Sequence, residues 1–243
     1  MTDRNLLKIG EICRRLAHHG RRFSRGIARA VTEPFRDRLP GRRQVADLCE
    51  YQELLADELE ARYVQLAAWY DRYLQVLEVV RDLRCQRDHL AAVLRQRLTQ
   101  VFDALQGSYP PGAIQRFLRR FRPLPASVDE LLQLAERFRA ALIDPRLELP
   151  PPRMGVEVDL MAVAASLEAP ARRLGEVLAE LPAAEAAVRL SRGQAAGALD
   201  QLHSFAGKVA AYYQALSDLA GDEQLARRLW KVVRRGQLSG RSR

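Results

Sequence analysis

Lysine is almost missing from this sequence of 243 residues, which contains only Lys8, Lys208 and Lys231. Cysteine is also scarce: Cys13, Cys49 and Cys85 are odd in number and lack the spacing of metal ligands. We therefore expect neither a disulfide framework nor a cysteine-based metal site. The scarcity of cysteine indicates a reduced protein of the cytoplasm.

Long apolar runs are missing as well. No stretch approaches the roughly 18 consecutive apolar residues that indicate a membrane span. Charges at Lys8, Glu11, Arg14 and Arg15 leave no room for the apolar region of a signal peptide. Runs of β-branched residues between turn residues are absent too, and Leu, Ala and Val dominate the apolar positions. These absences favour an all-α protein without a membrane-spanning helix.

The usual motifs of catalysis and cofactor binding are not present. The sequence has no Gly-rich phosphate loop, no Gly-x-Ser-x-Gly and no His-Glu-x-x-His. None of its four histidines follows a Glu by three residues, as the paired ligands of a di-iron helical bundle do. His18 and His19 are adjacent, so they point to opposite sides of a helix. We therefore expect no cofactor, no metal site and no enzymatic activity.

What the sequence does contain is a long apolar seam between Gln44 and Gln106. Twelve of its fifteen positions are apolar or aromatic, a regularity that favours a heptad repeat over the looser period of a globular helix. We predict one long helix over 44–106, which must bury its seam against another helix. Steps of three and four residues give Val45, Leu48, Gln52, Leu55, Leu59, Arg62, Leu66, Trp69, Tyr73, Val76, Val80, Leu83, Arg87, Leu90 and Leu94.

A second seam of similar length runs from Leu160 to Leu219. Pro170 and Pro182 lie within it, and each removes a backbone hydrogen bond, so we expect the helix to kink or restart there. Its middle is rich in Ala and Ser, which suits close pairing with bulkier residues of the first seam. The sequence thus predicts an all-α, elongated antiparallel hairpin of coiled-coil-like long helices with basic helical arms at both termini.

Turn residues and prolines separate two short helices between these seams. Residues 107–112 end the first long helix, and a short basic helix follows. The pattern from Ser127 to Glu130 is a capping box that opens a helix to about Ile143. We expect both short helices to pack at the turn of the hairpin. The predicted divisions are an arm and linker (1–43), the hairpin (44–226, comprising 44–106, 107–155 and 156–226) and a tail (227–243).

Basic residues are concentrated at the two ends. The net charge is +8 over residues 1–43, +7 over 227–243 and −6 between them. Residues 4–32 have the pattern of a basic amphipathic helix. Gly10, Gly20 and Gly26 should destabilise this helix, so we expect the segment to be poorly ordered until it meets a partner. The predicted residues for binding a partner or polyanion are Arg14, Arg15, Arg21, Arg22, Arg25, Arg29, Arg227, Arg228, Trp230, Lys231, Arg234 and Arg235.

Three kinds of partner fit these basic arms, apart from the plain alternative that they are solvated tails. A protein partner in a larger assembly, or a second copy of the chain, would offer an acidic groove. Nucleic acid would offer phosphates, and an anionic membrane surface would suit Arg beside Phe, Ile or Trp. The arms have few aromatic residues for stacking on bases. We therefore expect a non-catalytic scaffold or adaptor, with nucleic-acid binding as the alternative and membrane-surface binding third.

Four positions of the first seam are expected to set how the long helices pair: Arg62, Trp69, Tyr73 and Arg87. A buried charge is costly unless it is paired, so the two arginines should meet a carboxylate on the facing helix or extend to the edge of the seam. Trp69 and Tyr73 are expected in the core rather than at an interface. Tyr63 and Tyr70 widen the apolar stripe, which indicates more than one neighbour, for instance the short helices or a second copy.

Overall fold

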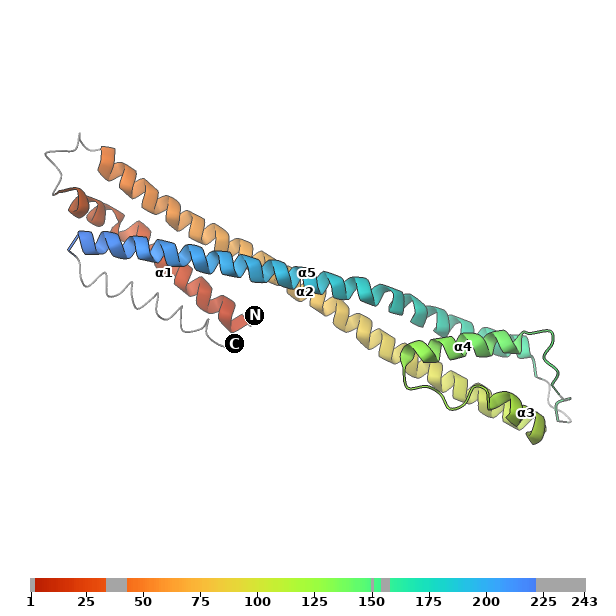
Figure 1. The fold of residues 1–243 in the computed structure, drawn as a ribbon. Helices are drawn as coiled ribbons and strands as arrows, with labels where there is room; N and C mark the ends of the chain where they lie inside the picture. Colours follow the sequence, from red (N-terminus) through yellow and green to blue (C-terminus); the bar gives the residue numbers. More distant parts are fainter. Residues whose placement is uncertain (1–2, 34–42, 150, 154–157, 222–243) are drawn as a thin grey trace. The chain divides into compact units, whose positions relative to one another are not determined.

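The computed structural model describes residues 3–33, 43–149, 151–153 and 158–221, and over these residues it contains helices and no strand. This confirms the all-α class. The two long helices lie within three residues of the bounds that the seams predict. The helices are α1 (Asp3–Thr32), α2 (Arg43–Ser108), α3 (Pro111–Leu118), α4 (Val128–Leu142) and α5 (Leu160–Leu219) (Figure 1).

The chain forms two compact units. Unit 1 consists of Met1–Gln75 with Arg189–Arg243, and unit 2 of Val76–Val188, so α2 and α5 contribute to both. In unit 1 the main-chain carbonyl of Gln52 accepts a hydrogen bond from Tyr213, while Arg62 lies over Phe205, so the helices run antiparallel. The antiparallel hairpin that the two seams predict is confirmed.

Both seams are turned inward. Every seam position of α2 from Leu48 to Leu94 is buried or half-buried, and on α5 only Leu219, at the end of the helix, is exposed. α5 continues through Pro170 and Pro182 without interruption, so of the two expected outcomes, a kink or a restart of the helix, the restart is wrong. Each proline removes only one hydrogen bond, and buried leucines in the flanking turns hold the helix in place.

Unit 2 has an apolar, aromatic core. Phe138 of α4 packs against Phe102 of α2, with ring centroids 4.9 Å apart, and against Phe117 of α3 at 5.9 Å. Leu167 and Leu174 of α5 complete this core. The two short helices therefore pack against the long ones, as expected. α4 begins directly after Ser127, but the Ser127 hydroxyl makes no capping hydrogen bond, so only the position of the capping box is correct.

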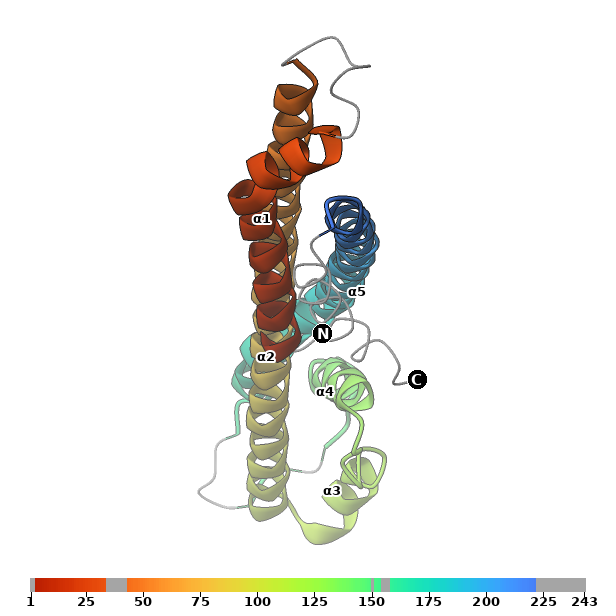
Figure 2. The same cartoon turned by 90° about the vertical axis from the view of Figure 1, so that its left-hand side faces the viewer.

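In unit 1, α1 packs against both long helices. Leu16 of α1 belongs to one core cluster with Leu59 and Leu66 of α2 and Leu202 of α5. Figure 2 shows α1 lying along α2. The expectation that this segment orders only with a partner is wrong, because its apolar stripe is buried within the same chain. The other predicted arm, 227–243, lies outside the described residues. None of the described helices is long and apolar enough to cross a membrane.

Candidate partner-binding surface

The arginines of α1 lie opposite its packed face. Ile9, Cys13, Leu16 and Ile27 are buried, as the helical period predicts for one stripe. At 1.5 Å per residue, the arginines spread over about 22 Å of helix. They are all exposed, namely Arg14, Arg15, Arg21, Arg22, Arg25 and Arg29. The structure therefore brings the six predicted binding residues of α1 to one surface.

Arg21 is already engaged within unit 1. Its guanidinium donates to Asp57 at 2.7 Å and to Glu60 at 2.8 Å, both on α2. Hydrogen bonding to Glu60 and then to Asp57 raises the pKa of Arg21, and the same bond lowers the pKa of the Glu60 carboxyl. All three side chains are exposed, so each pair contributes at most about 1 kcal/mol. Arg21 thus joins α1 to α2 rather than standing ready for a ligand.

The other arginines of α1 differ in their partners. Arg15 pairs with Glu11 of its own helix. The Arg14 Nε donates to the Gly10 carbonyl at 3.3 Å, and the Arg22 guanidinium lies 5.5 Å from the centre of the Phe23 ring. No carboxylate of the described residues forms an ion pair with the four arginines that we call the arginine face, namely Arg14, Arg22, Arg25 and Arg29.

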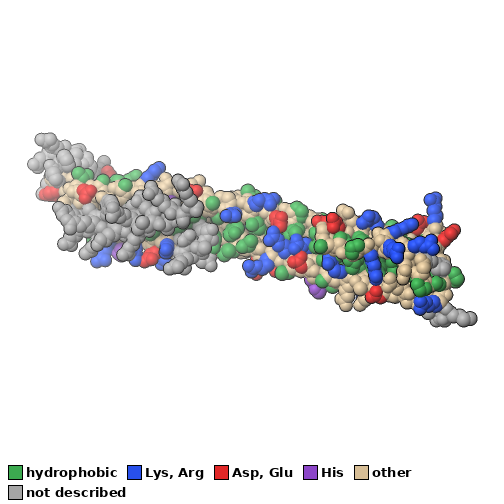
Figure 3. Space-filling view, turned by 60° about the horizontal axis from the view of Figure 1, so that its bottom comes forward, with side chains coloured by type: hydrophobic (Ala, Val, Ile, Leu, Met, Phe, Trp, Pro, Cys, Tyr) green, Lys and Arg blue, Asp and Glu red, His purple; other side chains and the backbone are tan. Residues whose placement is uncertain are grey.

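Unit 2 has exposed arginines of its own, which were not among the predicted binding residues. Arg116, Arg119 and Arg120 are exposed on and just after α3. Arg122 is 3.4 Å from Asp103 and stacks on the Phe102 ring at 5.3 Å. Figure 3 shows basic side chains interspersed with acidic ones where atoms are not grey. The arginines of α3 therefore provide a comparison set for those of α1.

α1 approaches its neighbours closely at Gly10 and Gly20. A Cβ on Gly10 would lie 2.4 Å from the Cζ of Tyr63, and a Cβ on Gly20 would lie 2.1 Å from the hydroxyl oxygen of Tyr213. Tyr213 is fully buried and donates to the Gln52 carbonyl at 3.1 Å, so it has little freedom to move. These two glycines do more than weaken the helix: they leave room for tyrosines of α2 and α5.

Tyr63 and Tyr70 widen the apolar stripe of α2, as expected. Tyr63 is half-buried against α1, and Tyr70 is buried. A second neighbour for the first long helix is therefore confirmed. In unit 1 this neighbour is α1, which was not among the examples offered by the sequence.

The register residues are in place, but with different partners. Arg62 pairs with Glu58 of its own helix at 2.6 Å and lies 4.4 Å from the centre of the Phe205 ring. Arg87 likewise pairs with the adjacent Asp88 at 2.8 Å. The prediction that each arginine pairs with a carboxylate on the facing helix is therefore wrong. Both are half-buried, in keeping with the edge of the seam, where a neighbouring carboxylate of the same helix is within reach.

An ion pair between the long helices does exist, one residue away from the seam. Arg84 of α2 donates to Glu185 of α5 at 2.7 Å within unit 2. Arg84 follows the seam residue Leu83, and such flanking positions let charged side chains stay hydrated while they reach across. The place of Arg84 beside the seam is the sequence signal that could have identified this ion pair.

Trp69 and Tyr73 are half-buried, and the Tyr73 ring lies 6.1 Å from that of Tyr70.

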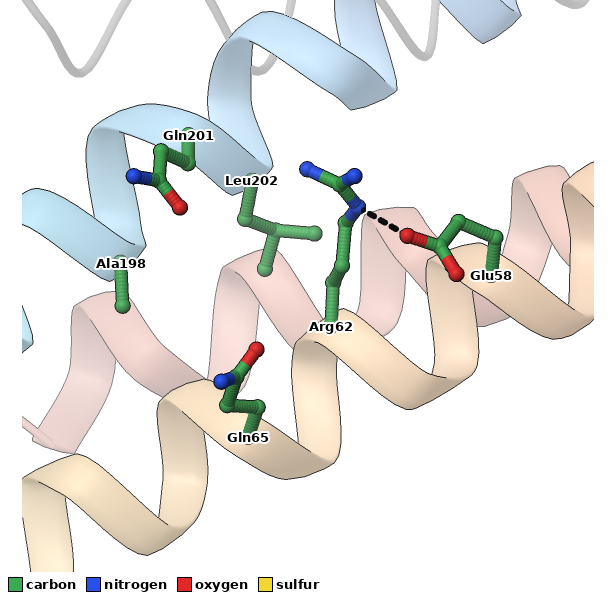
Figure 4. Close-up of a pocket in the computed structure, with 6 residues that line it drawn as sticks. All are labelled: Glu58, Arg62, Gln65, Ala198, Gln201 and Leu202. Atoms are coloured by element: carbon green, nitrogen blue, oxygen red, sulfur yellow. Dashed lines mark hydrogen bonds and ion pairs between the residues drawn. The ribbon is translucent and has the colours of Figure 1, made fainter.

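A small pocket lies between α2 and α5 of unit 1. Its volume is about 150 Å³, below the roughly 300–1,000 Å³ of typical small-molecule sites. Figure 4 shows Arg62 extending from α2 beside Leu202, with its ion pair to Glu58 at one side. The pocket is lined by Glu58, Arg62, Gln65, Ala198, Gln201 and Leu202.

No group of three or more His, Cys, Asp or Glu within the described ranges is placed to hold a metal ion. Cys13 is buried, and burial raises the pKa of its thiol to about 11; Cys85 is exposed, and all three cysteines are free thiols.

Comparisons with models of protein families, with curated proteins and with solved structures found no match.

Proposed function

We propose that this protein is a non-catalytic helical scaffold or adaptor of the cytoplasm whose arginine face binds an acidic surface of a protein partner. The supporting observation is that face: four exposed guanidinium groups on one packed helix, without carboxylate partners among the described residues. Guanidinium groups bind carboxylates through paired hydrogen bonds. The helix α1 holds the four arginines in one row, which reduces the conformational entropy lost on binding. The proposed binding surface also includes residues 227–243, because this segment is basic in sequence.

Charge reversal tests this function. Arg22→Glu, Arg25→Glu and Arg29→Glu together change exposed side chains only, so helicity and melting temperature should stay as in the wild type. We expect the triple variant to lose an acidic partner that co-purifies with the wild-type chain from the native host. Removing residues 1–43 would be a poorer test, because it would also uncover buried residues of α2 and α5.

A matched control is available in unit 2. Arg116→Glu, Arg119→Glu and Arg120→Glu make the same change in net charge at exposed positions and should retain the partner. Equal retention by both triple variants would contradict the proposal. DNA binding by the purified chain that falls steeply between about 50 and 200 mM salt would favour the nucleic-acid alternative. Flotation only with anionic vesicles would favour a membrane surface.

A further inference from the structure

The packing beneath α1 is polar at Gln52, whose main-chain oxygen would lie 3.2 Å from a Cβ on Gly20. The Gln52 side chain is fully buried, and neither its amide oxygen nor its amide nitrogen has a hydrogen-bond partner within the described part of the chain. Ser24 and Ser217 are buried as well, but their hydroxyls donate to carbonyls of their own helices at 3.3 and 2.8 Å. These hydroxyl groups therefore do not tie α1 to its neighbours.

Such an interface binds less tightly than an apolar one of the same size. A buried amide without a partner has lost its hydrogen bonds to water, and separation of the helices restores them. The contact of Arg21 with Asp57 and Glu60 opposes separation, but these side chains are exposed and their attraction is screened by salt. The Gln52 amide, which has no partner in the described part of the chain, thus lowers the cost of moving α1 away.

We propose that α1 is a releasable helix, which detaches as a unit from α2 and α5 while the rest of the chain stays folded. Release uncovers the apolar side chains of Leu59, Leu66 and Leu202. It also frees Arg21 from α2, so that Arg21 joins the arginine face. An acidic partner that competes for Arg21 therefore favours release, and release favours that partner equally. Only this coupling depends on the proposed function; the release itself does not.

The chain contains its own probe of release. Cys13 lies near the middle of α1 on the packed face, 1% exposed, so fraying of the helix ends does not reach it. Its thiol is unreactive while buried, because only a thiolate reacts readily. Cys85 is exposed on α2 and serves as an internal reference. The full-length chain is treated with N-ethylmaleimide at several urea concentrations, and labelling of each cysteine is measured by peptide mass spectrometry.

We expect Cys13 to react more slowly than Cys85, with a urea dependence much weaker than that of global unfolding followed by circular dichroism. Gly20→Ala should accelerate labelling of Cys13 about tenfold or more, because the added methyl group overlaps the buried Tyr213 hydroxyl. Gly26→Ala is the matched control on the same helix. Nothing lies within 4 Å of a Cβ at Gly26, so labelling of Cys13 in this variant should be no faster than in wild type.

Gln52→Leu provides an opposite test that does not depend on introducing a clash. It removes the buried amide and should slow labelling of Cys13. Labelling of Cys13 with the urea dependence of global unfolding would overturn the proposal, because α1 would then not leave by itself. Labelling of Cys13 as fast as Cys85 would overturn it too, because α1 would not be docked.

The coupling has a separate readout. Poly-L-glutamate should accelerate labelling of Cys13 in the wild-type chain but not in Arg21→Gln, in which α1 has already lost its contact with Asp57 and Glu60. No acceleration in the wild type would contradict the coupling. Because the first measurement contains no partner, failure of release and failure of the proposed function are distinguishable.

Discussion

Unit 1 and unit 2 are built on the same pair of long helices, yet their interiors differ. The described buried residues of unit 2 are apolar, and three phenylalanines from three helices meet there. Unit 1 instead holds every buried polar residue of the described ranges: His19, Ser24, Gln52, Ser191 and Ser217. Because buried polar groups weaken packing unless they are paired, we expect local opening to cost less in unit 1 than in unit 2.

The largest expected effect is in the aromatic core of unit 2. Phe138 is fully buried among three other phenylalanine rings, so Phe138→Ala leaves a cavity that should lower the free energy of unfolding by about 3–5 kcal/mol. Phe205→Ala, at a half-buried position of unit 1, should cost clearly less. Urea unfolding followed by circular dichroism measures both. Equal losses would contradict the difference in burial between these two positions.

A smaller loss is expected where α1 meets α5. Gly20→Ala places a methyl group 2.1 Å from the Tyr213 hydroxyl and should destabilise unit 1 by about 1–3 kcal/mol. Gly26→Ala should instead stabilise the chain by up to about 1 kcal/mol, since alanine favours the helix and meets no obstacle. Thermal melting compares the two variants. A stabilising Gly20→Ala would show that α1 does not pack closely there.

Removal of the buried amide should stabilise the chain, in contrast to Gly20→Ala. Gln52→Leu keeps the size and apolar stem of the side chain and should raise the free energy of unfolding by about 1 kcal/mol. The hydrogen bond from Tyr213 is retained, because it ends on the main-chain carbonyl of Gln52. Gln65→Leu, at an exposed position, should stay within about 0.5 kcal/mol of wild type. Denaturant titration distinguishes the variants, and a destabilising Gln52→Leu would show that the amide is satisfied.

The smallest effect is expected at Arg21. Its exposed contacts contribute at most about 1 kcal/mol, so Arg21→Gln should lower stability slightly and only at low salt. Arg21 depresses the pKa of Glu60 in the folded state below its ordinary 4.5. This contribution is therefore present above pH 4.5 and is lost as the pH falls through the lowered value. Unfolding measured against pH should show the difference between wild type and variant closing there; a constant difference would contradict this assignment.

The sequence predicts the long helices well because their burial repeats with a fixed period. Because the fifteen seam positions share one face, only one rotation of α2 about its axis buries them all. The second seam has a matching length, which identifies it as the partner of the first. The docking of α1 was harder to foresee. A glycine in a helix has the same intrinsic cost whether it faces water, as Gly26 does, or leaves room for a tyrosine, as Gly20 does. Only the neighbouring helix distinguishes the two.

Charged residues show the same limit. The sequence identified Arg62 and Arg87 as departures from the seam, yet each found a carboxylate on its own helix. Long side chains at the seam edge have several partners within reach, and periodicity does not rank them. Within the described ranges, four of the six α1 arginines predicted to bind a partner have no carboxylate partner, while Arg21 pairs with α2 and Arg15 with Glu11. Amphipathic spacing alone did not distinguish the arginines that have a carboxylate partner from those that do not.

The difference between the two units is tested most directly by native-state hydrogen exchange of the full-length chain, read out by mass spectrometry. We predict that central amides of α1 exchange through a low-energy opening with weak urea dependence, whereas those of α4 in unit 2 exchange only on global unfolding. α1 amides as protected as those of α4, with the same urea dependence, would contradict the account.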